Sequence, residues 1–142
     1  GIEALSDLVV QLGVLGRLVE FSGDASQPTL QYEAMWVLTN VASGNSAQSR
    51  AVIDAGALPV LVAGVAEGNA DVQDEAVWAL GNLAGDCAEH RDMALDAGAL
   101  QRIVDAVGRS READLALRRH AAWAISNLCR FKPRPPVERT SP

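Results

Sequence analysis

The chain has 142 residues, of which 49% are hydrophobic, 4% aromatic and 21% charged. This length suits one globular domain or a few short repeats, and the apolar fraction argues against disorder across residues 1–131. The 18 acidic and 12 basic residues give a net charge of −6, the opposite of the balance that a general nucleic-acid binder carries.

The sequence predicts neither a membrane span nor a secretory signal. Its longest apolar runs, such as residues 56–66, reach about a dozen residues against the roughly 20 of a membrane-spanning helix. Glu3 and Asp7 stand where a secretory signal would be basic. Cys87 and Cys129 give no disulfide framework, so we expect a reducing, intracellular setting. The chain does not begin with Met, which fits an excised or processed segment.

Charge is divided unevenly along the chain. Residues 1–87 have 11 acidic and 2 basic side chains, a net charge of −9, whereas residues 88–142 have 7 acidic and 10 basic ones, a net charge of +3. Such asymmetry either steers a cationic partner to the acidic part or is simply an unevenly charged solvated surface.

Two motifs alternate along the chain. The first is LGVLGRLVEF and its relatives AGALPVLVAG and AGALQRIVDA, at residues 12–21, 55–64 and 97–106. The second is EAMWVLTNVASG and its relatives EAVWALGNLAGD and HAAWAISNLCRF, at residues 33–44, 75–86 and 120–131. The Trp and the Asn of the second motif both recur after 42 and then 45 residues. This period is typical of armadillo and HEAT solenoids and of WD40 blades.

The repeated unit is predicted to be helical. Residues 71–85 are rich in Ala, Leu, Glu and Gln and show no alternation, and Leu58, Leu61 and Val65 recur at helical steps. A WD40 blade would need four short alternating strands per unit. In the middle unit we expect helices over residues 46–54, 58–65 and 71–84.

Three helices per unit favour the armadillo over the two-helix HEAT pattern. The predicted fold is therefore all-α, a right-handed armadillo solenoid of three three-helix repeats. The final segment has four prolines in eleven residues and is expected to be a Pro-rich linker or the truncated start of a next repeat. The predicted units are residues 1–45, 46–87 and 88–131, followed by the segment 132–142.

The third helix of each unit has one polar and aromatic stripe, because positions three or four apart share a helix face. A single Trp on a helix usually anchors a core. Polar neighbours on both sides of three equivalent Trp residues instead indicate a face for a ligand. The stripes are Glu33, Trp36, Asn40 and Ser43; Glu75, Trp78, Asn82 and Asp86; and His120, Trp123, Asn127 and Arg130.

The chemistry of these stripes predicts an extended, Lys/Arg-rich peptide ligand. An Asn amide has a donor and an acceptor for a peptide backbone, and indole faces attract cations at roughly 0.5–2 kcal/mol each. Stacked helices lie about 8–10 Å apart, close to three residues of an extended peptide at about 3.3 Å each. The carboxylates of Glu33, Glu75 and Asp86 also favour a basic ligand.

The segments WVLTNVASG, WALGNLAGD and WAISNLCR, with AVIDAGALPVLV between the first two, closely resemble importin-alpha (karyopherin alpha), the armadillo adaptor of nuclear import. The resemblance covers residues 8–136, corresponds to the second to fourth armadillo repeats, and rests on the repeated Trp-x-x-x-Asn pair. It implies the major pocket for nuclear localisation signals, and residence in cytoplasm and nucleus.

The resemblance also assigns roles to residues. It implies that Asp86 pairs with the key lysine of the signal, helped by the Gly44 carbonyl and the Ser49 hydroxyl, where the family has Thr. Glu75 replaces the usual Gln, and His120, which would weaken binding when protonated, replaces the usual Asn. The stacking residues and backbone clamps would be Trp36, Trp78 and Trp123, and Asn40, Asn82 and Asn127.

The resemblance also bears on other partners of the chain and on catalytic activity. The basic segment that binds importin-beta is absent from this chain, and exposed repeat ends make self-association plausible. We expect no enzyme, cofactor or metal, since His90 and His120 lie in no H-E-x-x-H or similar spacing. The rival hypothesis is a generic or engineered armadillo scaffold with a different peptide or protein partner, which would not need the repeated Trp.

Overall fold

The computed structural model describes residues 1–111, 114–135 and 137–140, and within these ranges every regular element is a helix. The all-helical fold predicted from the sequence is confirmed. The helices are α1 (Ile2–Gln11), α2 (Leu15–Ser22), α3 (Pro28–Ala42), α4 (Ser46–Asp54), α5 (Ala57–Glu67), α6 (Ala70–Asp86), α7 (Ala88–Asp96), α8 (Ala99–Arg109), α9 (Leu115–Leu128) and α10 (Val137–Thr140).

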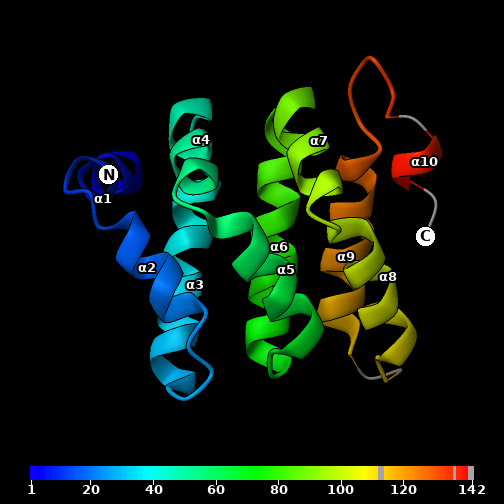
Figure 1. The fold of residues 1–142 in the computed structure, drawn as a ribbon, viewed down its shortest axis with the longest axis horizontal. Coiled ribbons are helices and arrows are strands. Elements are labelled where there is room, and N and C mark those ends of the chain that lie inside the picture. Colours follow the sequence, from blue (N-terminus) through cyan, green and yellow to red (C-terminus); the bar gives the residue numbers. More distant parts are fainter. Residues whose placement is uncertain (112–113, 136, 141–142) are drawn as a thin grey trace.

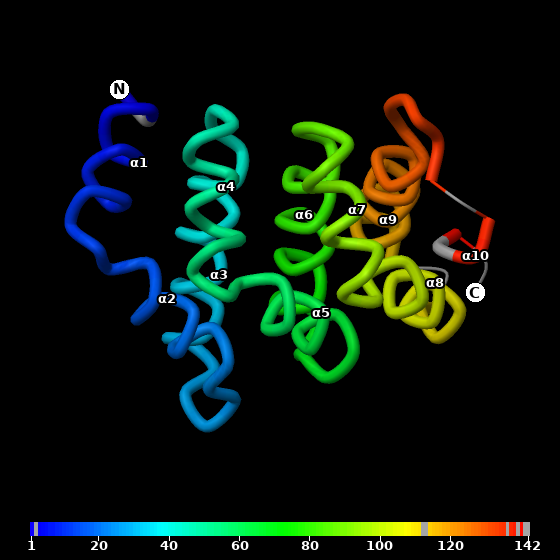
Figure 2. Tube along the Cα trace, turned by 45° about the horizontal axis from the view of Figure 1, so that its top comes forward, coloured from blue at the N-terminus to red at the C-terminus, as the bar shows by residue number. Residues whose placement is uncertain are grey.

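The helices stack in rows rather than around one centre. The three longest, α3, α6 and α9, stand next to one another in chain order, and α6 contacts both of its neighbours (Figure 1). The helices α2, α5 and α8 form a second row, in which α5 contacts α2 and α8 (Figure 2). Each three-helix unit thus buries its apolar faces against the next unit, as in a solenoid.

The central helix α6 contributes much of the core. It is packed between α3 and α9 and also against α5, so apolar residues around most of its circumference are fully buried, Val77, Leu80 and Leu83 among them. Full burial of one such side chain contributes about 1.5–3 kcal/mol. In the first unit the core continues through Met35 and Leu38 of α3.

Local capping signals set the ends of the helices. Asn45 and Asn69 accept hydrogen bonds from backbone N–H groups at the starts of α4 and α6. Gly56 and Gly98 have φ values of +89° and +88°, so the chain turns sharply before α5 and α8 at positions that favour glycine. Within the described residues no single helix is long and apolar enough to cross a membrane, and the pair α4–α5 reaches that length only across a 78° bend.

The segment after α9 is held against the third unit. Arg91 of α7 is almost completely buried, and its Nη1 donates to the backbone carbonyls of Arg130 at 2.5 Å and Pro133 at 2.8 Å. Oδ1 of Asp92 lies 2.9 Å from Nε and 2.8 Å from Nη2 of the same guanidinium. The backbone of residues 130–133 is therefore held by Arg91, while the side chains of Arg130 and Lys132 are exposed.

Candidate functional site

Three tryptophans lie on the surface of the row formed by α3, α6 and α9. Trp36, Trp78 and Trp123 are 49%, 42% and 39% exposed, although Trp is a large apolar residue that folding normally buries. Leu38 and Leu80 on the same helices are completely buried. The exposed indoles thus lie on the solvent-exposed face of the row, as expected for a ligand-facing stripe.

The asparagines one turn after the tryptophans have three different surroundings. The Nδ2 of Asn40 donates to the carbonyl of Trp36 in its own helix at 3.1 Å. Asn127 is buried, and its Nδ2 donates across the helix pair to the carbonyl of Gly81 at 3.0 Å. The Nδ2 of Asn82 is buried and has no hydrogen-bond partner among the described residues. Asn82 therefore has the most unused hydrogen-bonding capacity of the three.

A hollow of about 240 Å³ lies between α6, α9 and the turn from α3 to α4. It brings together eight of the predicted site residues from all three units. A larger hollow of about 530 Å³, between α2, α3 and α5, is lined by none of them. The predicted residues that line the smaller hollow are Ser43, Gly44, Ser49, Asn82, Asp86, Trp123, Asn127 and Arg130.

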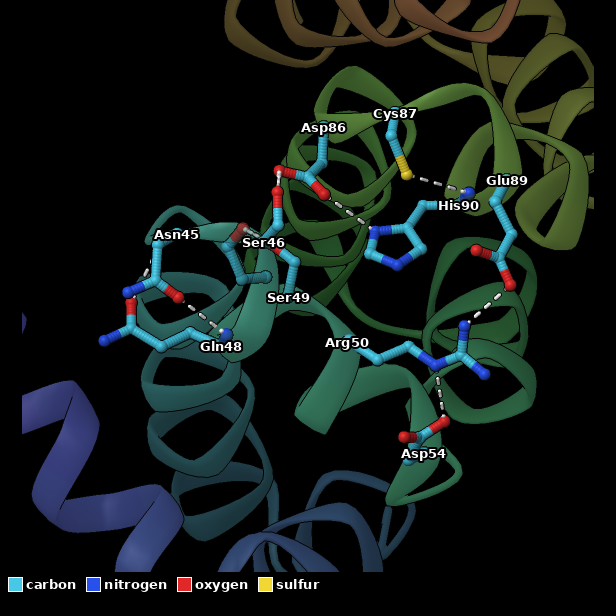
Figure 3. Close-up of polar contacts among 11 residues, drawn as sticks. Asn45, Ser46, Gln48, Ser49, Arg50, Asp54, Asp86, Cys87, Glu89 and His90 are labelled. Atoms are coloured by element: carbon cyan, nitrogen blue, oxygen red, sulfur yellow. Dashed lines mark hydrogen bonds and ion pairs between the residues drawn. The ribbon is translucent and has the colours of Figure 1, made fainter.

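Asp86 is held in place at this hollow by two neighbours (Figure 3). Its Oδ1 accepts from the Ser46 hydroxyl at 2.9 Å, and its Oδ2 lies 3.0 Å from Nδ1 of the buried His90. Sequence reasoning assigned Asp86 to this hollow but missed both neighbours. Asp86 ends α6 and His90 lies in α7 after the extended Cys87, so this contact depends on the turn between two helices and not on helical spacing.

Ser49 and Gly44 line the same hollow as Asp86. The Ser49 hydroxyl is fully buried and donates to the carbonyl of Ala42 at 3.0 Å, which leaves its oxygen lone pairs to accept. A Cβ on Gly44 would collide with the end of the Gln48 side chain, which would have to move to make room. The Ser43 hydroxyl bonds the carbonyl of Asn40 at 2.7 Å.

The two predicted carboxylates of the first stripes differ in exposure. Glu33 is exposed, whereas Glu75 is buried beside Thr39. Burial raises the pKa of the Glu75 carboxyl group above its ordinary value of 4.5, and the hydrogen bond from Thr39 opposes this only in part. Its Oε2 has no hydrogen-bond partner in the described part of the chain. Glu75 is therefore a weaker attraction for a cation than its position in the stripe indicated.

His120 occupies one face of a tryptophan. Its ring stacks on that of Trp78, with centroids 4.9 Å apart and planes at 25°, and its Nδ1 lies 2.7 Å from Oδ1 of Asp74. One face of Trp78 is therefore covered by an aromatic ring, while the residue as a whole is still 42% exposed. Sequence reasoning placed His120 on the stripe but missed Asp74, which lies in the adjacent helix.

Comparison with known proteins identifies the family. The model of the armadillo/beta-catenin-like repeat matches residues 45–85 and 87–130. The chain therefore belongs to the armadillo repeat family. Its curated relatives are importin-alpha subunits: importin subunit alpha-4 of Arabidopsis thaliana is 50% identical over 96% of this chain, and importin subunit alpha-B of Dictyostelium discoideum is 51% identical over 92%. The resemblance to importin-alpha is confirmed, and the chain spans about 25% of the length of these relatives.

Solved structures agree with this assignment. A designed armadillo repeat protein in complex with the peptide (KR)4 superimposes with a TM-score of 0.83 at 33% identity, over 92% of this chain and 53% of that one. An engineered protein superimposes with a TM-score of 0.83 at 28% identity, over 98% of this chain and 32% of that one. The predicted fold class, a right-handed armadillo solenoid of three-helix repeats, is confirmed, while the unit boundaries at 1–45, 46–87 and 88–131 stay a prediction.

Proposed function

We propose that this chain binds extended Lys/Arg-rich peptides along the face of α3, α6 and α9, as part of an adaptor for nuclear protein import. The observation that carries this proposal is the combination of three exposed tryptophans with a hollow that contains the carboxylate of Asp86 and is lined by one of them, Trp123. Indole faces attract cations and pack against apolar stems, and a carboxylate attracts a cation. Together they favour Lys and Arg side chains.

The hollow suits the ammonium group of a lysine. Asp86 supplies the negative charge, and Ser49 and Gly44, which line the same hollow, would supply a hydroxyl and a carbonyl oxygen as acceptors. An ammonium has three N–H donors that point in different directions, which matches separate acceptors better than the planar fork of arginine does. One position of the bound peptide is therefore expected to prefer lysine.

The backbone of the peptide would be held by the asparagines. Asn82 is the principal clamp in this proposal, because its Nδ2 has no partner in the described residues. Asn40 and Asn127 each retain one N–H and a carbonyl oxygen after their internal bonds. A clamp of this kind recognises the backbone and not the side chains, so peptides of different sequence would bind in the same register.

His120 lies beside a second place for a cationic side chain of the peptide, the space between Trp78 and Trp123. A Lys or Arg side chain entering between Trp78 and Trp123 would meet the His120 ring on one wall and Asp74 behind it. Protonation of His120 adds a like charge at this wall, so the position is expected to be more selective than the Asp86 hollow. Arg130, which is exposed, lines the Asp86 hollow and adds a positive charge there.

The wider role in this proposal is based on the names of the relatives, which are importin-alpha subunits. As a segment of an importin-alpha-like adaptor, the chain would hold cargo through nuclear localisation signals and would reside in cytoplasm and nucleus. Its link to importin-beta would run through a segment outside this chain, and its exposed repeat ends would allow self-association. The function is binding without catalysis, and it involves neither nucleic acid nor a membrane.

The test is a fluorescence titration with a Lys-rich peptide, since all three tryptophans lie on the proposed face. Emission should change strongly with this peptide and stay constant with its Ala-substituted version. Asp86→Lys should weaken binding by roughly 2–5 kcal/mol, because it places a like charge in the hollow. Asp105→Lys makes the same charge change on α8, away from the hollow, and should bind nearly as the unaltered chain does.

Two results would overturn the proposal. One is an Asp86→Lys protein that is folded by circular dichroism and binds the peptide as strongly as before. The other is the absence of any response to basic peptides, which would favour an armadillo scaffold with a different partner.

A further inference from the structure

Three side chains with metal-binding atoms meet at the junction of α6 and α7. The carboxylate of Asp86, the thiol of Cys87 and the imidazole of His90 each offer one donor atom, and these atoms all lie within 4.8 Å of one another (Figure 3). Neither Cys87 nor His90 has a role in the proposed peptide site. Their spacing, Asp-Cys-x-x-His, follows from the sequence, but their convergence follows only from the fold.

The backbone brings the three donors together. The helix α6 ends at Asp86, Cys87 is extended with φ −158° and ψ 168°, and α7 begins directly after it. Cys87 caps α7, and its Sγ accepts from the backbone N–H of His90 at 3.5 Å. This bond holds the sulfur at the first turn of α7, the turn to which His90 belongs.

Two of the donor atoms are buried without a hydrogen bond. Nδ1 of His90 and Oδ2 of Asp86 lie 3.0 Å apart, the distance of an ion pair when the imidazole is protonated, and neither atom has a hydrogen-bond partner within the described residues. His90 is only 4% exposed. Buried polar atoms without partners are unfavourable, and two of them aimed at one point beside a thiol suit a cation between them.

We propose that Asp86, Cys87 and His90 bind a zinc ion through Oδ2, Sγ and Nδ1. Zinc prefers this mixture of oxygen, sulfur and nitrogen ligands in a tetrahedron, with a water completing the fourth position. On binding, the S–H bond of Cys87 breaks as the S–Zn bond forms, and the proton passes to solvent. The N-terminus of α7 favours the resulting thiolate.

Neighbouring residues support the ligand set. The Ser46 hydroxyl donates to Oδ1 of Asp86 at 2.9 Å, which turns Oδ2 towards His90. Such an outer hydrogen bond orients a metal ligand and adds to affinity. The nearest basic side chain on α4, Arg50, is engaged by Asp54 and Glu89 at 2.9 and 2.7 Å.

The zinc site would control peptide binding, a consequence that rests on the proposed function. Asp86 is also the proposed partner of the ligand lysine. A zinc ion on Oδ2 cancels the charge of the carboxylate, and the thiolate balances the remaining charge of the ion. Peptide affinity should therefore fall when zinc is bound.

The first experiment measures zinc alone. The reduced, metal-free chain is titrated with zinc chloride by calorimetry, and with cobalt to detect the thiolate–metal absorption band. One ion per chain is expected. Cys87→Ser and His90→Gln should each weaken zinc binding at least about tenfold. Ser caps a helix well, so Cys87→Ser should fold, as checked by circular dichroism.

The chain provides matched controls in its other cysteine and histidine. Cys129→Ser and His120→Gln should leave zinc affinity unchanged. Absence of zinc uptake, or uptake that Cys87→Ser does not alter, would overturn the zinc site.

The second experiment repeats the peptide titration with and without saturating zinc. Affinity should fall at least several-fold in the unaltered chain and stay constant in Cys87→Ser. Equal peptide affinity in both conditions would overturn the control by zinc. A chain that binds no basic peptide in the absence of zinc would contradict the proposed function, while the zinc titration still decides the metal site.

Discussion

The indole ring of Trp123 in α9 lies directly on Gly81 in α6. A Cβ atom on Gly81 would come within 2.4 Å of Cζ3 of this ring, a distance that no real side chain keeps. Four residues later the arrangement repeats, because a Cβ on Gly85 would come within 2.7 Å of Nδ2 of Asn127. The two glycines thus let one Trp–Asn pair rest on the backbone of the neighbouring helix, with the outer face of the indole exposed.

Gly81→Ala should displace Trp123. We expect the free energy of unfolding to fall by about 1–3 kcal/mol, as for overpacking of a close contact, and the tryptophan emission of the folded protein to change. Urea unfolding followed by circular dichroism and fluorescence measures both. Gly108→Ala is the matched control, because a Cβ there meets nothing within 4 Å. Equal effects of the two substitutions would contradict the proposed contact.

Asn82→Ala and Asn127→Ala should separate binding from stability. The Nδ2 of Asn127 bonds the Gly81 carbonyl in the interior, so its loss should lower the free energy of unfolding by about 1–3 kcal/mol. The Nδ2 of Asn82 has no such bond, so Asn82→Ala should change stability little. It should instead weaken basic peptides of different sequence alike, by about 1–3 kcal/mol.

Peptide titrations and urea unfolding of both variants provide the comparison. A loss of binding in Asn82→Ala that is confined to one peptide sequence would indicate a side-chain contact rather than a backbone clamp.

Binding of a Lys-rich peptide should weaken as salt is added. The first 87 residues have a net charge of −9, and the proposed face includes the exposed Glu33 and the carboxylate of Asp86. Between about 0.1 and 1 M salt the Debye length falls from about 10 Å to 3 Å. The dissociation constant from fluorescence titration should rise several-fold across this range. An unchanged constant would mean that charge contributes little to recognition.

Glu75→Gln should stabilise the fold at neutral pH. Burial raises the pKa of the Glu75 carboxyl above its ordinary value of 4.5, so ionisation is harder in the folded state than in the unfolded state. Stability is therefore lost as the pH rises from below 4.5 through the raised value. Gln does not ionise, and it should keep the shape of the side chain without this loss.

Urea unfolding of both proteins at about pH 7 and about pH 4 tests this. The advantage of Glu75→Gln should be present at the higher pH and shrink at the lower one. Glu33→Gln, at an exposed position of α3, should change stability little at either pH. A variant that is less stable than the unaltered chain at pH 7 would show that the ionised carboxylate is favourable in its place.

The helices could be predicted because their signals are local. The sequence predicted helices at residues 46–54, 58–65 and 71–84, and the structure has Ser46–Asp54, Ala57–Glu67 and Ala70–Asp86. Asparagine caps and left-handed glycines act within a few residues of each end. The exposed Trp stripe was predictable for a similar reason, since two similar spacings along the chain, of 42 and 45 residues, produce three equivalent positions in a solenoid.

Contacts between helices were not predictable in the same way. The stacking of His120 on Trp78 and the bond from Asn127 to Gly81 join residues more than 40 positions apart. Nothing in either local segment specifies which face of the neighbouring helix will meet it. The burial of Glu75 also depends on a neighbour, since Thr39 of α3 lies beside it. The sequence could place these residues on the stripe but not describe their surroundings.

The buried Arg91 bears on where this chain can be cut. A shortened version that stops at the end of α9 would keep every long helix, yet it would remove the carbonyls at Arg130 and Pro133 that accept from the guanidinium. The permanently charged group would then keep its contact with Asp92 but lose these backbone acceptors. A fragment that keeps these acceptors for Arg91 thus extends past residue 131, the last predicted repeat residue, to Pro133.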